Sequence, residues 1–180
     1  MGVSMDGRVA VVTGGSSGIG LATAQAFLSE GFKVAICGRS HKRIEDARDI
    51  LLQNATPENF SSHVCDVLDA DAVEQLRLEV IEKFGRCDTL VCNAGQARTS
   101  NFYNTSDQDW SDEFELKIFS VLRPVRAFAD LLEKSGGGSV VCTSAILARR
   151  PEPFLIATAA TRAGQLNLLK SLSIEFASRN

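Results

Sequence analysis

Short apolar runs alternate with longer stretches in which apolar residues recur every three or four positions. The short runs predict strands, because a strand covered on both sides reads as a brief apolar segment; they occupy residues 8–13, 33–37, 61–65, 88–92 and 139–143. The longer stretches predict helices with one apolar face; they occupy residues 18–30, 41–54, 70–84, 107–133 and 158–177. Gly31 and Gly85 follow two of these helices, where a left-handed glycine commonly ends a helix.

The fourth predicted helix contains Pro124. Proline lacks an N–H donor, and its ring meets the carbonyl of residue i−4, which costs about 3 kcal/mol inside a helix. We therefore expect residues 107–133 to form a long helix with a kink at Pro124.

Strands and helices alternate along the whole chain. This order produces right-handed crossovers and a parallel sheet with helices on both faces. Because no internal repeat or linker interrupts it, the sequence predicts one doubly wound α/β domain over residues 1–180. Ligands bind such sheets at the carboxyl ends of the strands, so functional residues are expected in the loops that follow strands.

The composition narrows the class of protein. Apolar residues make up 44% and charged residues 23% of the chain, which argues against disorder. The formal net charge is −3, so no basic field for nucleic acid is expected. The apolar runs are too short to span a bilayer, and the N-terminal residues lack the core of a signal peptide. We therefore expect a cytoplasmic protein with neither a nucleic-acid partner nor a membrane partner.

Cysteine and histidine give no indication of a metal site. His41 and His63 are far apart in the sequence and have no obvious acidic partner. No two cysteines have the spacing of a zinc or redox motif, so we expect reduced thiols packed in the core. The cysteines are Cys37, Cys65, Cys87, Cys92 and Cys142.

The loop after the first predicted strand, residues 13–20, contains spaced glycines at positions 14, 18 and 20. Glycines permit a tight turn and let a ligand approach the backbone closely. The helix that starts there directs free N–H groups and its positive dipole end into the turn, which favours a pyrophosphate. The alternative is an ordinary tight turn between a strand and a helix. The candidate phosphate-binding residues are Gly14, Ser16, Ser17, Gly18, Ile19 and Gly20.

Four segments together resemble one known family. The turn has the spacing T-G-x-x-x-G-x-G, and Asp66-Val67, Cys92-Asn93-Ala94-Gly95 and the tract 162–172 occur further along. From Gly7 to Ala177 the chain resembles the short-chain dehydrogenase/reductase family. The resemblance implies a Rossmann-like fold, a nicotinamide cofactor, and a carbonyl or alcohol substrate. The cofactor contacts that it implies beyond the turn are Asp66, Val67, Asn93, Ala94, Gly95 and Arg162.

The resemblance is weakest at the family's catalytic positions. Members of the family carry a tyrosine and, four residues later, a lysine at the start of the last helix. Alignment on the following Ala-Gly pair puts Thr158 and Arg162 there. Tyr103, the only tyrosine in the sequence, is out of register with this motif.

The family's catalytic serine and asparagine are also replaced. The serine position falls on Ala145, with Ser144 beside it, and the asparagine position falls on Lys117. A threonine hydroxyl is a poor general acid near neutral pH, and arginine cannot give up its proton. Lys117 can act as the acid if burial and a neighbouring positive charge lower its pKa. The candidate catalytic residues are Lys117, Ser144, Thr158 and Arg162.

The end of the second predicted strand indicates NADP(H) rather than NAD(H). A preference for NAD usually rests on a carboxylate there that binds the ribose 2′-hydroxyl. Here the strand is followed by Arg39, with no carboxylate beside it. An arginine can bind a 2′-phosphate through charge-assisted hydrogen bonds, although a solvated surface charge is the alternative.

The sequence stops before the last strands of the family fold, so the strand at 139–143 is expected to be an open edge. The resemblance implies that the helices at 107–133 and 158–177 pair across a two-fold axis. We therefore expect a homo-oligomer, a dimer or a tetramer.

Three functional hypotheses follow. The first is an NADP(H)-dependent oxidoreductase of the short-chain type with a degenerate catalytic set. The second is a non-catalytic nucleotide-binding relative with a regulatory or scaffolding role. The third is a truncated chain that needs a partner chain to complete its sheet.

Overall fold

The computed structural model describes residues 7–179, which contain one parallel five-stranded sheet. The strand order is β3-β2-β1-β4-β5, with β1 at Val9–Thr13, β2 at Lys33–Gly38, β3 at Phe60–Val64, β4 at Thr89–Cys92 and β5 at Ser139–Cys142. Val11 of β1 lies opposite Ala35 of β2 and Leu90 of β4, so β1 is central. The predicted doubly wound parallel sheet is confirmed.

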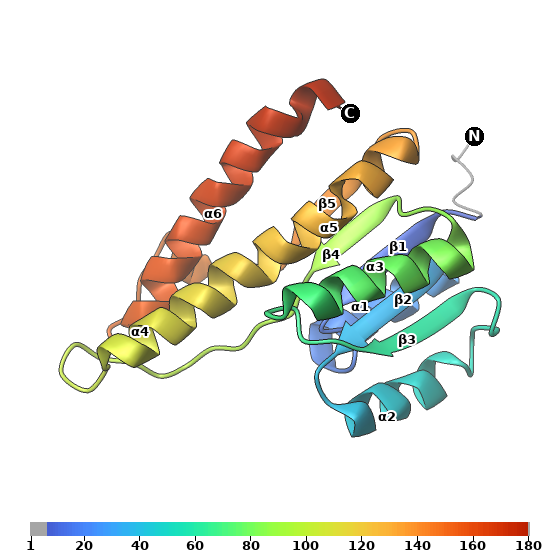
Figure 1. Ribbon diagram of the computed structural model, residues 1–180. Helices are drawn as coiled ribbons and strands as arrows, with labels where there is room; N and C mark the ends of the chain where they lie inside the picture. Colours follow the sequence, from blue (N-terminus) through green and yellow to red (C-terminus); the bar gives the residue numbers. More distant parts are fainter. Residues whose placement is uncertain (1–6, 180) are drawn as a thin grey trace.

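Helices cover both faces of the sheet (Figure 1). On one face lie α1 (Gly18–Ser29) and α2 (His41–Leu51). The other face carries α3 (Ala70–Phe84), α5 (Ser120–Lys134) and α6 (Ile156–Phe176), and α4 (Asp107–Phe114) packs against α6. Two short 3-10 turns, η2 (Ile146–Ala148) and η3 (Ala177–Arg179), complete the described chain.

Alternate residues of β1 belong to two separate cores. Val9 and Val11 belong to the core that includes Phe128 of α5. Ala10 and Val12 belong to the core on the α1 and α2 side. All of β1 is buried, because successive strand residues point to opposite faces and helices cover both.

The long helix predicted over residues 107–133 is not continuous. A π-helical segment, η1 (Glu115–Phe119), separates α4 from α5. The interruption therefore lies before Pro124, which is buried inside α5, and the prediction placed it wrongly. The carbonyl that the proline ring meets belongs to Ser120, the first residue after η1. The widened turn thus lies immediately before the backbone that the proline distorts, and it contains Lys117.

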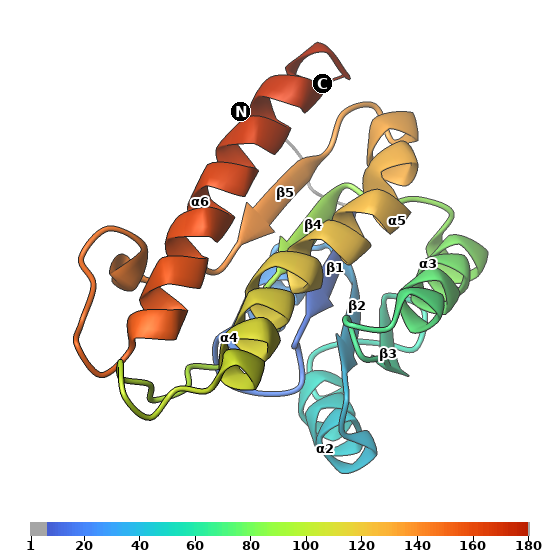
Figure 2. The same cartoon turned by 60° about the vertical axis from the view of Figure 1, so that its left-hand side comes forward.

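β5 is an open edge of the described sheet, with α6 beside it (Figure 2). It pairs with β4, and Val141 is 50% exposed. An apolar groove of about 290 Å³ lies between α5, α6 and β5. The groove is lined in part by Val125, Leu132, Val140, Leu169, Leu172 and Phe176. The open edge agrees with the expectation from the sequence.

The cysteines are free thiols, as predicted, and all except the half-buried Cys142 are buried. The expectation that the histidines lack acidic partners is wrong. His63 of β3 pairs with Glu79 of α3, and His41 lies 3.3 Å from Glu45 one helical turn away. Within residues 7–179 no group of three or more metal-ligating side chains is gathered. None of the helices in this range has the length and apolar character needed to cross a membrane.

Asp88 connects the beginnings of β1 and β4. Its buried carboxylate accepts the Val9 N–H at 2.8 Å and two hydrogen bonds from the Arg86 guanidinium at 2.6 and 2.9 Å. Burial alone would raise the pKa of Asp88, but these bonds outweigh it, so the pKa lies below the ordinary value.

We predict that Asp88→Ala lowers the free energy of unfolding by about 1–3 kcal/mol at pH 7, because it leaves a buried N–H and a guanidinium without their partner. A carboxyl whose folded-state pKa is depressed stabilises the protein above its unfolded pKa of about 3.9. That contribution is lost as the pH falls through the folded-state value, so the difference between the two proteins shrinks toward pH 3.

Urea denaturation at pH 7 and pH 3 measures both effects. Glu82→Ala, at an exposed position of α3, is the control and should change the free energy of unfolding by less than about 0.5 kcal/mol. Equal stability of the wild type and Asp88→Ala at pH 7 would contradict this role of Asp88.

Candidate functional site

The side chain of Asn93 connects three loops at the carboxyl edge of the sheet. Its Nδ2 donates to the carbonyls of Thr13 and Gly14 at 3.1 and 3.2 Å, and its Oδ1 accepts the Thr143 hydroxyl at 3.1 Å. The Thr13 hydroxyl accepts the backbone N–H groups of Asn93 and Ala94 at 3.0 and 3.1 Å. The turn after β1 is therefore held against the loops after β4 and β5.

Glycine is required at two positions of this arrangement. Gly14 has a φ of +64°, and a Cβ there would lie 2.9 Å from Cα of Ala94. A Cβ on Gly20 would lie 2.3 Å from the carbonyl oxygen of Gly14 and 2.5 Å from Nδ2 of Asn93. A larger residue at either position would push the turn away from the loop after β4.

The N-terminus of α1 opens onto the same turn. Ser17 precedes the helix, and its side chain makes no capping hydrogen bond within the described residues. Ser17, Gly18 and Ile19 are exposed, and Ser16 is half-buried. The first N–H groups of the helix are thus free at the positive end of its dipole, an arrangement that can bind a phosphate.

A cleft beside the turn brings together predicted cofactor residues from the loops after β1, β2, β3 and β4. Arg39 is exposed at its rim, with Gly38 ending β2 before it. The predicted residues in the lining are Gly14, Arg39, Asp66, Val67, Ala94 and Gly95. Cys65, Gln96 and Leu116 also line the cleft and were not predicted.

Arg162 of α6 is half-buried at this edge. Its Nη1 donates to the carbonyl of Thr143 and to Oε1 of Gln165, both at 2.7 Å. A Cβ on Gly95 would lie 3.5 Å from Nη2 of Arg162. The Nε atom is buried without a partner among the described residues. Buried donors are rarely left unpaired, so this N–H suits a bound acceptor.

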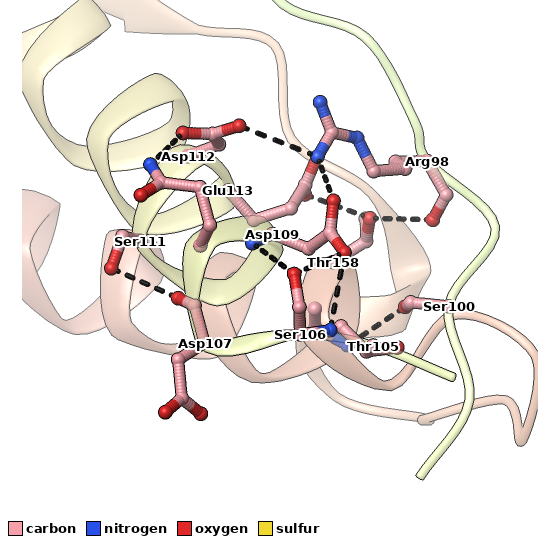
Figure 3. Close-up of polar contacts among 12 residues, drawn as sticks. Arg98, Ser100, Thr105, Ser106, Asp107, Asp109, Ser111, Asp112, Glu113 and Thr158 are labelled. Carbon is pink, nitrogen blue, oxygen red and sulfur yellow. Dashed lines mark hydrogen bonds and ion pairs between the residues drawn. The ribbon is translucent and has the colours of Figure 1, made fainter. Parts of the chain in front are cut away.

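Lys117 has an enclosed ammonium group and is only 1% exposed. Its Nζ donates to the carbonyl of Gln96 at 2.6 Å and lies 3.0 Å from Oε2 of Glu113. The Thr158 hydroxyl donates to the same carboxylate oxygen at 2.9 Å and lies 3.4 Å from the carbonyl of Arg98 (Figure 3). Two of the replaced catalytic positions thus meet at Glu113.

Burial and the charge of Arg162 shift the pKa of Lys117 in the direction expected from the sequence. Burial lowers the pKa of Lys117, Glu113 acts in the opposite direction, and the charges of Arg162 and Arg98 lower it further. The ammonium group points at Glu113 and at the carbonyl of Gln96, two contacts that the sequence did not predict.

The remaining candidates are more accessible. Ser144 is exposed and follows Thr143, whose carbonyl binds Arg162. Ala145, at the family's serine position, is half-buried. Tyr103 is 90% exposed on the loop before α4 and is not among the residues that line the cleft.

Glu113 and Gln165 belong to the site, although the sequence analysis did not identify them. Gln165 is buried, and its Nε2 donates to the carbonyl of Lys117 at 2.6 Å. Glu113 is four residues before Lys117, the spacing at which opposite charges pair on one helix face. That spacing is a signal in the sequence, whereas nothing in the sequence singles out Gln165.

Comparison with known proteins finds relatives along almost the whole chain. The sequence model of the short chain dehydrogenases matches residues 8–180. An uncharacterized oxidoreductase of Staphylococcus haemolyticus is 32% identical over 173 residues, which cover 96% of this chain and 73% of that protein.

Solved structures agree with this assignment. The NADPH-bound short chain oxidoreductase of Pseudomonas aeruginosa, described as containing an atypical catalytic center, is 46% identical with a TM-score of 0.93. The L-sorbose reductase of Gluconobacter frateurii, complexed with NADPH and L-sorbose, is 29% identical, also with a TM-score of 0.93. This chain is covered to 96% and 100% and spans 67% and 68% of those chains. The chain belongs to the short-chain dehydrogenase/reductase family.

Proposed function

We propose that the chain is an NADP(H)-dependent oxidoreductase that acts on a carbonyl or alcohol substrate. The observation that carries this proposal is the cleft beside the glycine turn, where predicted cofactor residues from four loops line one space. Asn93 holds the turn against the loop after β4, and both segments line the cleft. Two similar solved proteins are described with NADPH, which supports the same cofactor here.

Each part of the cofactor has a matching group in this cleft, at the adjacent N-terminus of α1 or on Arg162. The free N–H groups of α1 suit the pyrophosphate, and the exposed Arg39 guanidinium suits the 2′-phosphate. Asp66 and Val67 line the cleft and suit the adenine, as the family resemblance implies. Arg162 suits the nicotinamide ribose, because its unpaired Nε can donate to a ribose hydroxyl. The bound nicotinamide supplies the hydride chemistry.

The chain itself orients the substrate and moves its proton. Ser144 is exposed next to Thr143, whose carbonyl binds Arg162, so its hydroxyl can donate to a substrate oxygen. Thr158 and Lys117 are both buried against Glu113, and Arg162 keeps its proton. The Thr158 hydroxyl and the Arg162 guanidinium release a proton with difficulty, which leaves Lys117, whose pKa burial lowers, as the candidate acid.

The chain also carries an apolar surface suited to a second copy. Ile174 of α6 is 79% exposed. Exposed apolar side chains on a helix favour association. We propose a homo-oligomer in which α6 contacts the second copy.

The proposed cofactor predicts a preference for NADPH over NADH in direct titrations of the purified chain. Arg39→Ala should weaken NADPH binding about tenfold or more and leave NADH binding unchanged, because only NADPH carries the 2′-phosphate. Arg48→Ala removes an exposed arginine from the last turn of α2 and serves as the charge-matched control. Equal affinity of the wild type for the two cofactors would show that Arg39 does not select between them.

The replaced catalytic positions predict that binding and turnover separate. With saturating NADPH and a panel of ketones, reduction should be about 10²–10⁴-fold slower than in a relative that keeps the tyrosine. If Lys117 supplies the proton, the residual rate falls as the pH rises through its lowered pKa and disappears in Lys117→Ala. Lys134→Ala, at an exposed position of α5, is the control. Rapid reduction that is insensitive to Lys117→Ala would refute this assignment.

Light scattering at micromolar concentration tests the association. We expect a mass of at least twice the 19.4 kDa of one chain. Ile174→Lys should shift the mass toward the monomer, whereas Ile50→Lys, at an exposed position of α2, should not. A monomer in the wild type at all concentrations would contradict the proposed oligomer.

A further inference from the structure

Glu113 is a carboxylate enclosed between α4 and α6. It is 1% exposed, and its Oε2 is shared by the Lys117 ammonium at 3.0 Å and the Thr158 hydroxyl at 2.9 Å. Figure 3 shows Glu113 and Thr158 converging from α4 and from the start of α6. None of the functional assignments above gives Glu113 a role.

A buried ion pair contributes little to the free energy of unfolding. The desolvation of two charges offsets most of their attraction, and apolar residues of similar size are often equally stable. Glu113 and Lys117 are both 1% exposed, so this cost is present on both sides of the pair. A pair kept in such a place suggests a requirement for a defined geometry rather than for stability alone.

Lys117, one partner of the pair, contacts the loop after β4. Nζ of Lys117 donates to the carbonyl of Gln96, which lines the cleft directly after Gly95. Arg98, two residues further on, is paired with Asp109 of α4 at 2.7 Å (Figure 3). The loop after β4 is thus fastened to the α4–η1 segment at two points.

Glu113, the other partner, is linked through Thr158 to the part of α6 that carries Arg162. Thr158 is one helical turn before Arg162 on α6, so the hydroxyl bond to Glu113 fixes the turn that precedes the guanidinium. Gln165 links Arg162 back to Lys117, because it accepts a hydrogen bond from Arg162 and donates one to the carbonyl of Lys117. Glu113 therefore lies between the loop that follows Asn93 and the helix that carries Arg162.

We propose that Glu113 is a positioning residue for the nicotinamide half of the cofactor. It holds Lys117 and Thr158 in place. These two residues in turn fix the distance between the loop that contains Gln96 and the Arg162 guanidinium. The adenosine half binds at the opposite end, at Arg39 and Asp66, and does not depend on Glu113. This inference rests on the proposed NADP(H) function, since it assigns one part of that site.

Calorimetric titration with NADPH and with adenosine 2′,5′-bisphosphate separates the two halves. Glu113→Gln should weaken NADPH binding about tenfold, whereas binding of the bisphosphate should stay within about twofold of the wild type. The matched control is Glu115→Gln, which removes the same charge two residues away, from a carboxylate that is half exposed and paired with Arg123. This control should bind both ligands like the wild type.

A second variant keeps the test decisive if Glu113→Gln unfolds. The double change Glu113→Leu with Lys117→Met replaces the pair by apolar groups and should fold, because no unpaired charge is left. It should still bind NADPH about tenfold more weakly and retain the bisphosphate. Thermal unfolding of each variant confirms that folded proteins are compared.

Wild-type affinity for NADPH in the folded double variant would overturn the role of Glu113. An equal loss of both ligands would also overturn it, because a general distortion of the cleft would then explain the result. If the wild type binds neither ligand, the proposed function itself fails, and the inference fails with it. The wild-type titration, together with the ratio of each variant's affinities for NADPH and for the bisphosphate, distinguishes these three results.

Discussion

The amide of Asn93 donates to two backbone carbonyls of the glycine turn and accepts a hydroxyl from the loop after β5. Parallel strands end at one edge of a sheet, but this alone does not fix how their loops meet. The three hydrogen bonds fix that arrangement, and they explain why Gly20 leaves no room for a Cβ beside Asn93. The cleft and the N-terminus of α1 lie beside the turn that these bonds hold, and Arg162 approaches Gly95 in the loop that contains Asn93.

The other end of the site is organised by charge. Glu113 and Lys117 form a buried pair inside and next to the π-helical segment, and Thr158 joins them from α6. π segments often occur at functional sites. Here the segment turns Lys117 inward toward the loop after β4, and its carbonyl accepts Gln165. Two of the positions that the family resemblance marks as catalytic, Lys117 and Thr158, are thus buried against Glu113, whereas Ser144 is exposed.

Local patterns in the sequence were sufficient for the parallel sheet, the order of elements and the glycine turn. Each of these depends on apolar periodicity or on residues close together in the chain. The pairing of His63 with Glu79 and of Glu113 with Thr158 joins segments that only the tertiary fold brings together. Pro124 predicted an interruption of the long helix but not its position, because the π segment begins well before the proline. The inward direction of Lys117 follows from that unpredicted segment.

A structure of the chain crystallised with NADPH tests the assignment of the two ends of the cleft most directly. The 2′-phosphate should contact Arg39, and a hydroxyl of the nicotinamide ribose should lie about 3 Å from Nε of Arg162. Lys117 should remain on Glu113 and Gln96. A cofactor bound away from the glycine turn, or a Lys117 ammonium turned from Glu113 toward the nicotinamide, would contradict this arrangement.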